Sequence, residues 1–258
     1  MQASIFVISL PDCVERQQAI ASQLDKHSLT FSWIEGVNGR QLDADTLRQV
    51  YSVERAEREG GRQLNPGEIG CALSHQKIYR AMLAQNIPLA LVLEDDAALA
   101  ADFGECLIDI CANVDWESVD LLLLSHIQKY TAWGAHPIAA NRELVKPLVA
   151  YNGNGYLVTR RGAEHLLSQL TPIYQPADCW NHLRRLRVLN IRGIVPYLVN
   201  HSSLSVDSLI GEALREAPVL TSIRYQPGRL LKRVFYDKFI YQILVKPLLR
   251  IRRQPMPW

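Results

Sequence analysis

Residues 89–99 read LALVLEDDAAL, an apolar run that ends on three adjacent carboxylates, Glu94, Asp95 and Asp96. A run without polar alternation is typical of a strand buried on both faces of a parallel sheet. In such sheets ligands bind at the carboxyl ends of the strands, where these acids are expected to lie. A single acid is enough to favour the start of a following helix. Because three adjacent charges repel one another unless a cation is near, the run favours a cation site.

The chemistry of the three acids indicates which cation and ligand to expect. Carboxylate oxygens suit Mg²⁺ or Mn²⁺, which bind through one or two carboxylates and keep positions for water and phosphate oxygens. A metal-bridged diphosphate is therefore expected at this edge of the sheet. The sequence has no Gly-x-x-x-x-Gly-Lys-Ser/Thr loop, and no Gly-x-Gly-x-x-Gly follows its first apolar segment. Neither a P-loop NTPase nor a dinucleotide oxidoreductase is supported.

Outward from this stretch, strand patterns and helix patterns alternate along the chain. Strands are predicted at 4–10, 29–34, 119–126 and 156–159, and helices at 11–24, at 68–84 and from 162. No internal repeat and no low-complexity linker interrupts them. The alternation predicts an α/β fold with a mainly parallel central sheet flanked by helices.

Composition limits the class of protein. A chain of 258 residues with 48% hydrophobic residues can bury a substantial core, as one large domain or two small ones. The five cysteines contain no Cys-x-x-Cys pair or other metal-ligand spacing, and an odd, scattered set favours a reducing cytoplasm. The N-terminus lacks the features of a signal peptide, and no apolar run is long enough to span a bilayer.

Charge is distributed unevenly along the chain. Residues 224–258 carry nine Lys/Arg residues against one acid, a charge of +8, so the remaining residues carry −6. An acidic body with a basic tail argues against a nucleic-acid-binding domain. Large apolar residues among the basic ones predict an amphipathic helical segment, residues 223–258, on an anionic membrane surface. A packed C-terminal helix or a partner-binding helix is the competing interpretation.

Five segments, in this order and at these separations, resemble glycosyltransferase family 25, which includes bacterial lipooligosaccharide galactosyltransferases and collagen galactosyltransferases. They are IFVISLPDCVERQ (5–17), GVNGRQL (36–42), LNPGEIGCALSHQKIYRAML (64–83), PLALVLEDDA (88–97) and NGYLVTRRGAEHLL (154–167). The resemblance covers roughly residues 4–210. It implies a GT-A-like fold over residues 1–222, a UDP-sugar donor and an inverting transfer that makes a β-glycosidic bond.

The resemblance assigns the acidic triplet to the metal and the donor. It implies that Asp96 coordinates Mn²⁺ (or Mg²⁺) directly and that Glu94 contacts the ribose or the ion through water, with Asp95 beside the nucleotide. Many GT-A enzymes complete the metal shell with a C-terminal histidine, which makes His201 a candidate third ligand. A hydrogen-bonded loop histidine is the alternative for His201.

Other residues of the matching segments are candidates for donor binding. Arg16 and Asn38 are placed to line the nucleoside pocket; a solvated helix face and a plain turn are the alternatives. Ser74 and Lys77 are three residues apart on the predicted helix and can reach one ligand. His75 lies between them, with a buried, hydrogen-bonded role as its alternative.

Acceptor binding and catalysis are assigned to the later segments. Asn152 and Asn154 alternate with glycines that let the backbone approach a sugar closely, unless they form a plain turn. Asp178 follows a proline, as an aspartate does in the family, and is the candidate base for the acceptor hydroxyl. Trp180 is a platform for the acceptor sugar or part of the core.

These features predict a metal-dependent, inverting UDP-hexose transferase, a β-galactosyltransferase acting on a lipooligosaccharide outer-core sugar at the cytoplasmic face of the inner membrane. The alternatives are a UDP-glucose or UDP-N-acetylhexosamine transferase of the same fold, a Mg²⁺-dependent phosphohydrolase, and a non-enzymatic module that binds membranes or lipopolysaccharide. The galactosyltransferase and the two alternative enzymes differ in the donor they use and the product they release. The non-enzymatic module would still bind its lipid after loss of the acidic triplet.

Overall fold

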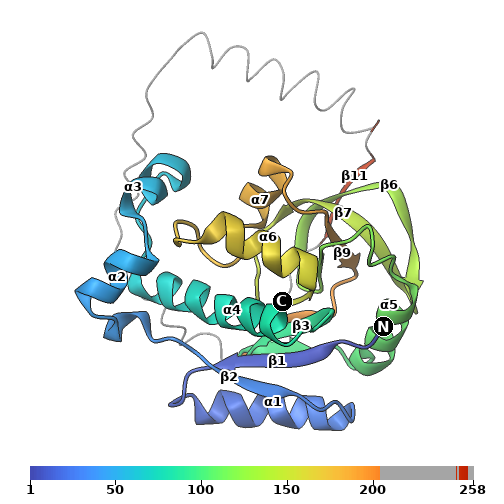
Figure 1. The fold of residues 1–258 in the computed structure, drawn as a ribbon. Coiled ribbons are helices and arrows are strands. Elements are labelled where there is room, and N and C mark those ends of the chain that lie inside the picture. The colour runs from blue at the N-terminus through green and yellow to red at the C-terminus, as the bar shows by residue number, and fades with distance from the viewer. Residues whose placement is uncertain (204–247, 249, 255–258) are drawn as a thin grey trace.

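The computed structural model describes residues 1–203, 248 and 250–254. In these residues, nine strands form a large sheet and two short strands form a second one (Figure 1). The large sheet has the order β11-β6-β7-β9-β5-β8-β3-β1-β2. Its strands are β1 (Ser4–Ser9), β2 (Ser32–Glu35), β3 (Leu89–Glu94), β5 (Leu121–Leu123), β6 (Ile127–Ala139), β7 (Arg142–Ala150), β8 (Gly155–Thr159), β9 (Ile191–Val195) and β11 (Ile251–Arg253).

Helices occupy much of the chain between these strands. They are α1 (Val14–Lys26), η1 (Gly39–Gln41), α2 (Ala44–Val50), α3 (Val53–Arg55), η2 (Ala56–Gly60), α4 (Pro66–Ala84), α5 (Phe103–Asn113), α6 (Arg160–Leu170) and α7 (Trp180–Leu186). The small sheet pairs β4 (Ala97–Leu99) antiparallel with β10 (Val199–His201).

Most strands of the large sheet run in one direction. β1 pairs parallel with β2 and β3, and β5 pairs parallel with β9, whereas β8, β7 and β11 pair antiparallel with their neighbours. The predicted α/β fold with a large, mostly parallel sheet flanked by helices is thereby confirmed. Because β8 is reversed, its amino end lies at the same edge of the sheet as the carboxyl ends of β1 and β3.

The strand β3 is buried on both faces, as its unbroken apolar run predicts. Ala90 and Val92 belong to one hydrophobic core, which includes residues of α4 and α6. Leu91 and Leu93 belong to the other, which includes residues of α1 and α5. The two cores are therefore the two faces of one sheet, and Figure 1 shows α4 and α1 on opposite sides of β1.

The long helix α4 begins with a complete set of start signals. The Asn65 side chain accepts a hydrogen bond from the backbone N–H of Glu68, and the Glu68 carboxylate accepts one from the backbone N–H of Asn65. Pro66 fits the first turn because its nitrogen has no hydrogen to leave unpaired. At Gly70 the helix approaches η1 so closely that an added Cβ would lie 2.3 Å from the Val37 oxygen. The capping box and the close approach fix α4 against the end of β2.

Two features differ from the predictions made from sequence. The hairpin of β6 and β7 was missed, because shifts in its register break the alternation that marks a strand. Most of the predicted helical tail, residues 223–258, lies outside the described residues. Within its described part, the prediction of helix is wrong for Ile251–Arg253, which pairs with β6 as strand β11. The backbone groups along the free side of β6 provide partners that a local sequence pattern does not reveal.

Within the part of the chain that the structure describes, none of the helices combines the length and apolar character needed to cross a bilayer. The predicted domain boundary near residue 222 falls outside the described residues.

Candidate active site

The three acids that end β3 point to three different sets of partners. Glu94 faces the α4 residue His75, Asp95 faces Ser9 at the end of β1, and Asp96 faces His201 in β10. β3 ends at Glu94, and Asp95 and Asp96 lie in the turn that leads to β4, so the three side chains point toward different partners. The expected repulsion within the triplet is therefore reduced by divergence and by separate partners.

Asp95 is buried in a polar contact between β1 and α1. Ser9 Oγ donates a hydrogen bond to Asp95 Oδ2 at 2.6 Å, and Arg16 Nη1 lies 3.5 Å from Asp95 Oδ1. Burial raises the pKa of Asp95, and the Ser9 hydrogen bond and the Arg16 charge act against that rise. Two of the predicted donor-site residues, Arg16 and Asp95, thus contact each other at the carboxyl edge of the sheet.

Asp96 and His201 are brought together by the small sheet. The register of β4 and β10 places His201 opposite Ala97, and His201 Nδ1 lies 3.5 Å from Asp96 Oδ2. A hydrogen bond with Asp96 raises the pKa of His201. The other carboxylate oxygen, Asp96 Oδ1, is buried and has no hydrogen-bond partner among the residues that the structure describes. An unpaired buried oxygen beside an imidazole is a donor set that fits a divalent cation such as Mn²⁺.

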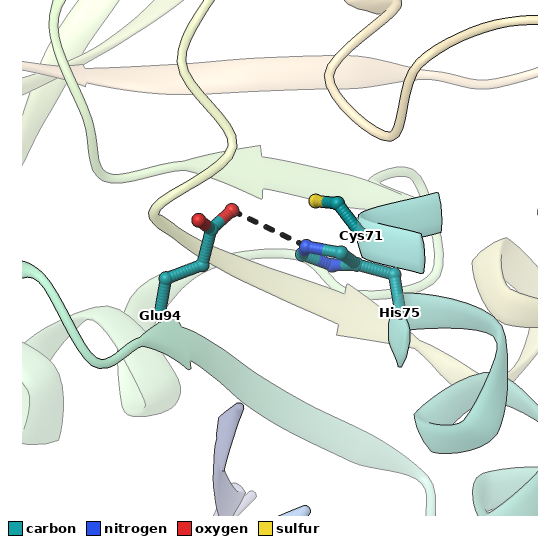
Figure 2. Close-up of side chains that lie close together, drawn as sticks. All are labelled: Cys71, His75 and Glu94. Carbon is teal, nitrogen blue, oxygen red and sulfur yellow. Dashed lines mark hydrogen bonds and ion pairs between the residues drawn. The ribbon is translucent and has the colours of Figure 1, made fainter. Parts of the chain in front are cut away.

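Glu94 ends a chain of hydrogen bonds that runs into the core. Glu94 Oε1 lies 3.3 Å from His75 Nε2, and His75 Nδ1 lies 2.7 Å from the Tyr156 hydroxyl. That hydroxyl lies 2.5 Å from the hydroxyl of Tyr79. Cys71 is one helical turn before His75, and Figure 2 shows both side chains on α4 with the Glu94 carboxylate facing the imidazole. The buried alternative for His75 is therefore correct, and the imidazole also contacts an acid of the triplet.

Asp178 lies close to Glu94, with the backbone of Gly153 between them. A Cβ built on Gly153 would lie 3.2 Å from Asp178 Cβ and 3.6 Å from Glu94 Oε1. Burial, followed by the charge of Glu94, raises the pKa of Asp178 to about 7. A carboxylate with a pKa near neutrality is well matched to proton transfer at neutral pH. Its place beside Glu94 and its raised pKa are consistent with the prediction that Asp178 is a general base.

Two of the predicted acceptor residues have structural roles instead. Trp180 is only 2% exposed and belongs to the core, where its indole N–H donates to the Asn152 carbonyl oxygen at 2.8 Å. It cannot stack on a sugar from that position. Asn154 is 1% exposed; its side chain accepts from Ser125 Oγ and donates to the Asn200 carbonyl oxygen. Its predicted sugar contact is wrong because burial and these two bonds occupy the amide.

Two residues of α4 that were predicted to bind the donor, Ser74 and Lys77, hold the segment after β2 against α4. Ser74 is buried, donates to the Gly70 carbonyl oxygen and accepts from the Val37 N–H. Lys77 Nζ donates to the Glu35 carbonyl oxygen at 2.8 Å. Asn38 accepts from the Arg40 N–H, which is the turn role given as its alternative. Ser74 and Lys77 therefore both bind backbone groups at the end of β2 or just after it, and their predicted contact with a donor stays a prediction.

Sequence reasoning missed four contributors to this edge of the sheet: Ser9, Cys71, Gly153 and Tyr156. The spacing of Cys71 and His75, four residues apart on a helix, was the one available signal, because such residues share a helix face. The prediction that the cysteines show no metal-ligand spacing did not take a Cys–His pair on one helix face into account. The other three residues depend on strand pairings that local patterns do not encode.

Comparison with known proteins gives consistent matches. The family model described as "Glycosyltransferase family 25 (LPS biosynthesis protein)" matches residues 2–180. Procollagen galactosyltransferase 1-B of Xenopus laevis is 27% identical over 172 residues, covering 64% of this chain and 28% of that protein. A glycosyltransferase 25 family member of Aedes aegypti is 29% identical over 192 residues, covering 69% of this chain and 31% of that protein.

A putative glycosyltransferase of Haemophilus influenzae is 27% identical over 169 residues, covering 63% of this chain and 56% of that protein. This chain thus spans less than a third of the Xenopus and Aedes relatives and about half of the Haemophilus one. The family model, however, matches well over half of the chain, from β1 through the first residue of α7. The chain belongs to glycosyltransferase family 25.

Proposed function

We propose that this chain transfers a hexose, galactose, from a UDP-sugar to a sugar acceptor with inversion at the anomeric carbon. Membership of glycosyltransferase family 25 supports sugar transfer, and relatives named procollagen galactosyltransferases support galactose. The observation that carries the proposal is Asp178, whose carboxylate combines a pKa of about 7 with a place beside the acids that end β3. The donor diphosphate is assigned to the carboxyl edge of the sheet.

Asp178 acts as the base in this proposal. The acceptor hydroxyl oxygen forms a bond to the anomeric carbon of the donor, and the bond from that carbon to the phosphate oxygen breaks. The hydroxyl proton passes to the Asp178 carboxylate, and UDP leaves. With a pKa of about 7, roughly half of the Asp178 carboxyl groups are ionised at pH 7 and can accept this proton.

Asp96 and His201 are the residues that would hold Mn²⁺ (or Mg²⁺). The unpaired oxygen of Asp96 and the adjacent imidazole supply one hard and one borderline donor. A bound divalent ion supplies Lewis-acid stabilisation of the negative charge on the leaving diphosphate. Asp95, held by Ser9 and Arg16, keeps its charge away from the other two acids and stabilises the end of β1 against β3.

The positive charge of the C-terminal residues supports a proposal for the acceptor and for the location of the protein. We propose that the acceptor is an outer-core sugar of a lipooligosaccharide and that the protein is peripheral on the cytoplasmic face of the inner membrane. The support is the +8 charge of residues 224–258 with their large apolar side chains, which suits an anionic lipid surface. A lipid-linked acceptor is found at such a surface.

The central experiment follows UDP release by the purified full chain from a panel of UDP-sugars. Each is tested with Mn²⁺ or EDTA, and with or without sugar acceptors. We expect UDP release that is fastest with UDP-galactose, requires an acceptor and is abolished by EDTA. Fastest release from UDP-glucose or from a UDP-N-acetylhexosamine would identify that sugar nucleotide, instead of UDP-galactose, as the donor. Release of UMP or inorganic phosphate without acceptor would identify a phosphohydrolase, and binding without turnover would identify a non-enzymatic module.

A further inference from the structure

We propose that Cys71, His75 and Glu94 form a binding site for a thiophilic divalent ion, Zn²⁺, separate from Asp96 and His201. The three side chains offer a sulfur, an imidazole nitrogen and a carboxylate oxygen, and these atoms all lie within 4.8 Å of one another. Figure 2 shows the three groups converging from α4 and the end of β3. The inference rests on this geometry and does not require the proposed transfer reaction.

The distances suit a tetrahedral ion. His75 Nε2 and Glu94 Oε1 are 3.3 Å apart. Two ligands that are each about 2.0–2.1 Å from a tetrahedral Zn²⁺ lie about 3.3 Å from each other. Cys71 and His75 are four residues apart on α4, so that both side chains emerge from the same face of the helix. The Cys71 sulfur, which lies within 4.8 Å of both atoms, completes three ligands and leaves a fourth position for water.

The imidazole of His75 is held in one orientation by its surroundings. The ring is 2% exposed, stacks on the Tyr156 ring at a centroid distance of 5.7 Å, and contacts the Tyr156 hydroxyl through Nδ1. The Tyr79 hydroxyl holds that phenol in turn. Histidine ligands of metals are oriented in this way by a partner on the other ring nitrogen. Nε2 is left facing Glu94, where an ion would bind.

Charge at the site favours a cation, and the donor set favours zinc. Glu94 and Asp178 lie on either side of Gly153 and place negative charge next to the Cys71 sulfur and the His75 imidazole. This negative charge attracts a divalent ion, which displaces the thiol proton as it binds. A sulfur, nitrogen and oxygen set suits Zn²⁺ better than Mg²⁺ or Mn²⁺, which prefer oxygen ligands alone.

The test uses Co²⁺, which reports sulfur ligation by a thiolate-to-cobalt charge-transfer band. The reduced full chain is titrated with Co²⁺ in excess Mg²⁺, which fills sites made of oxygen ligands. We expect one equivalent of Co²⁺ to produce the band and one equivalent of Zn²⁺ to remove it. Competition with a chromophoric chelator should give a Kd for Zn²⁺ below about 1 µM. Absence of the band from the wild-type chain would overturn the proposal.

Matched variants locate the ligands. Cys71→Ser should abolish the band and weaken Zn²⁺ binding at least about tenfold, whereas Cys13→Ser, at another half-buried cysteine, should leave both unchanged. Asp96→Asn should also leave the band unchanged while impairing UDP release, which separates this site from the proposed donor metal. A band that survives Cys71→Ser, or that disappears in Asp96→Asn, would contradict the assignment. Circular dichroism of each variant checks that it folds.

Discussion

His201 Nδ1 lies 3.5 Å from Asp96 Oδ2 because β10 pairs antiparallel with β4, directly after the acidic triplet. Within the described part of the chain, the second oxygen of Asp96 is buried and without a hydrogen-bond partner. One strand pairing thus joins a residue of the family-matched region, 2–180, to a residue beyond it. The contact between Asp96 and His201 is the observation that supports the proposed metal dependence.

Asp96→Asn should lower UDP release by about 100-fold, because it removes the anionic ligand from the proposed metal site. Raising the Mn²⁺ concentration should restore part of the rate if binding of the ion is what has been lost. The measurement is the initial rate of UDP release as a function of Mn²⁺. Asp102→Asn, which affects a carboxylate paired with Arg142, is the matched control and should change the rate little. Equal rates for wild type and Asp96→Asn would reject the metal role of Asp96.

The ion pair of His201 with Asp96 should stabilise the metal-free protein most at low pH. The hydrogen bond to Asp96 raises the pKa of His201 above its ordinary value of 6.5, so the folded protein binds this proton more tightly than the unfolded chain. The contribution is fully present below about pH 6.5 and is lost as pH rises through the higher folded-state pKa. Because the side chain is 43% exposed, the effect should not exceed about 1 kcal/mol.

His201→Gln in EDTA should therefore lower the free energy of unfolding at about pH 5.5 and change it less at about pH 9. Urea unfolding at the two pH values measures the difference. A destabilisation that is the same at both values would show that the pair contributes through packing rather than through charge.

The pKa of Asp178 predicts the pH dependence of catalysis. Because a base must be deprotonated, kcat/KM should rise about tenfold per pH unit below pH 7 and level off above it. Glu94→Gln removes a like charge and should move the midpoint below 7. The midpoint should stay above the ordinary value of 3.8 because burial, the larger cause, remains. Glu164→Gln, an exposed acid of α6, is the control and should leave the midpoint unchanged.

Asp178→Asn should lower turnover by about 10²- to 10⁴-fold. The raised pKa also means that ionised Asp178 opposes folding, so the wild-type protein loses stability as pH rises from about 4 to about 7. The variant should therefore be more stable than wild type at pH 8 while being inactive. An inactive variant that is also less stable would point to damaged folding, and near-normal turnover would exclude Asp178 as the base.

Gly70→Ala should destabilise the protein by about 1–3 kcal/mol, because the new methyl group meets backbone atoms that cannot rotate away. Its Cβ would lie 2.3 Å from the Val37 oxygen and 2.6 Å from the Gly39 nitrogen. Urea unfolding measures the loss. Gly61→Ala is the control: Gly61 has a φ of +78° and open space around it, so only backbone strain of roughly 1 kcal/mol is expected. Equal losses in the two variants would contradict a close contact between α4 and η1.

Membrane binding by the basic tail can be tested without disturbing β11. Replacing Arg229, Lys232 and Arg233 by Gln should weaken binding to anionic vesicles about 100-fold, because each basic residue near the surface contributes about 1 kcal/mol. Co-sedimentation with phosphatidylglycerol vesicles at low and high salt measures the change.

A control with the same loss of charge replaces three exposed residues of the body by Gln, namely Lys26, Arg48 and Lys146. Binding that falls equally in both triple variants would indicate a general charge effect. Binding unaffected by the tail substitutions would reject the tail as the anchor.

The parts of the fold that were predicted are those that depend on local patterns. The unbroken apolar run of β3 predicts burial on both faces, and the structure places its alternate residues in two cores. The helix predicted at 68–84 is found as α4, which begins two residues earlier, at Pro66. The hairpin of β6 and β7 and the strand β11 depend on pairing between distant segments, which local periodicity does not encode.

For the candidate site, too, the sequence predicted what depends on local patterns and missed what depends on contacts between distant segments. The position of the acidic triplet follows from the end of its strand, but the partners of each acid depend on which way successive side chains point. Trp180 and Asn154 illustrate the limit, because their residue types suit both sugar binding and a buried hydrogen-bonded role. Burial decides between the two roles, and it is a property of the assembled fold.

Strand β11 has a consequence for biosynthesis. Residues 251–253 pair with residues 129–131 of β6, whose last residue is Ala139, so 114 residues must be added after β6 before this pairing can form. At about 5–20 residues per second, the ribosome needs roughly 6 to 23 s to add them. During that interval the nascent chain presents an uncovered strand edge of the kind that recruits other strands. Chaperone demand and aggregation during expression should therefore be highest before residues 251–253 leave the exit tunnel.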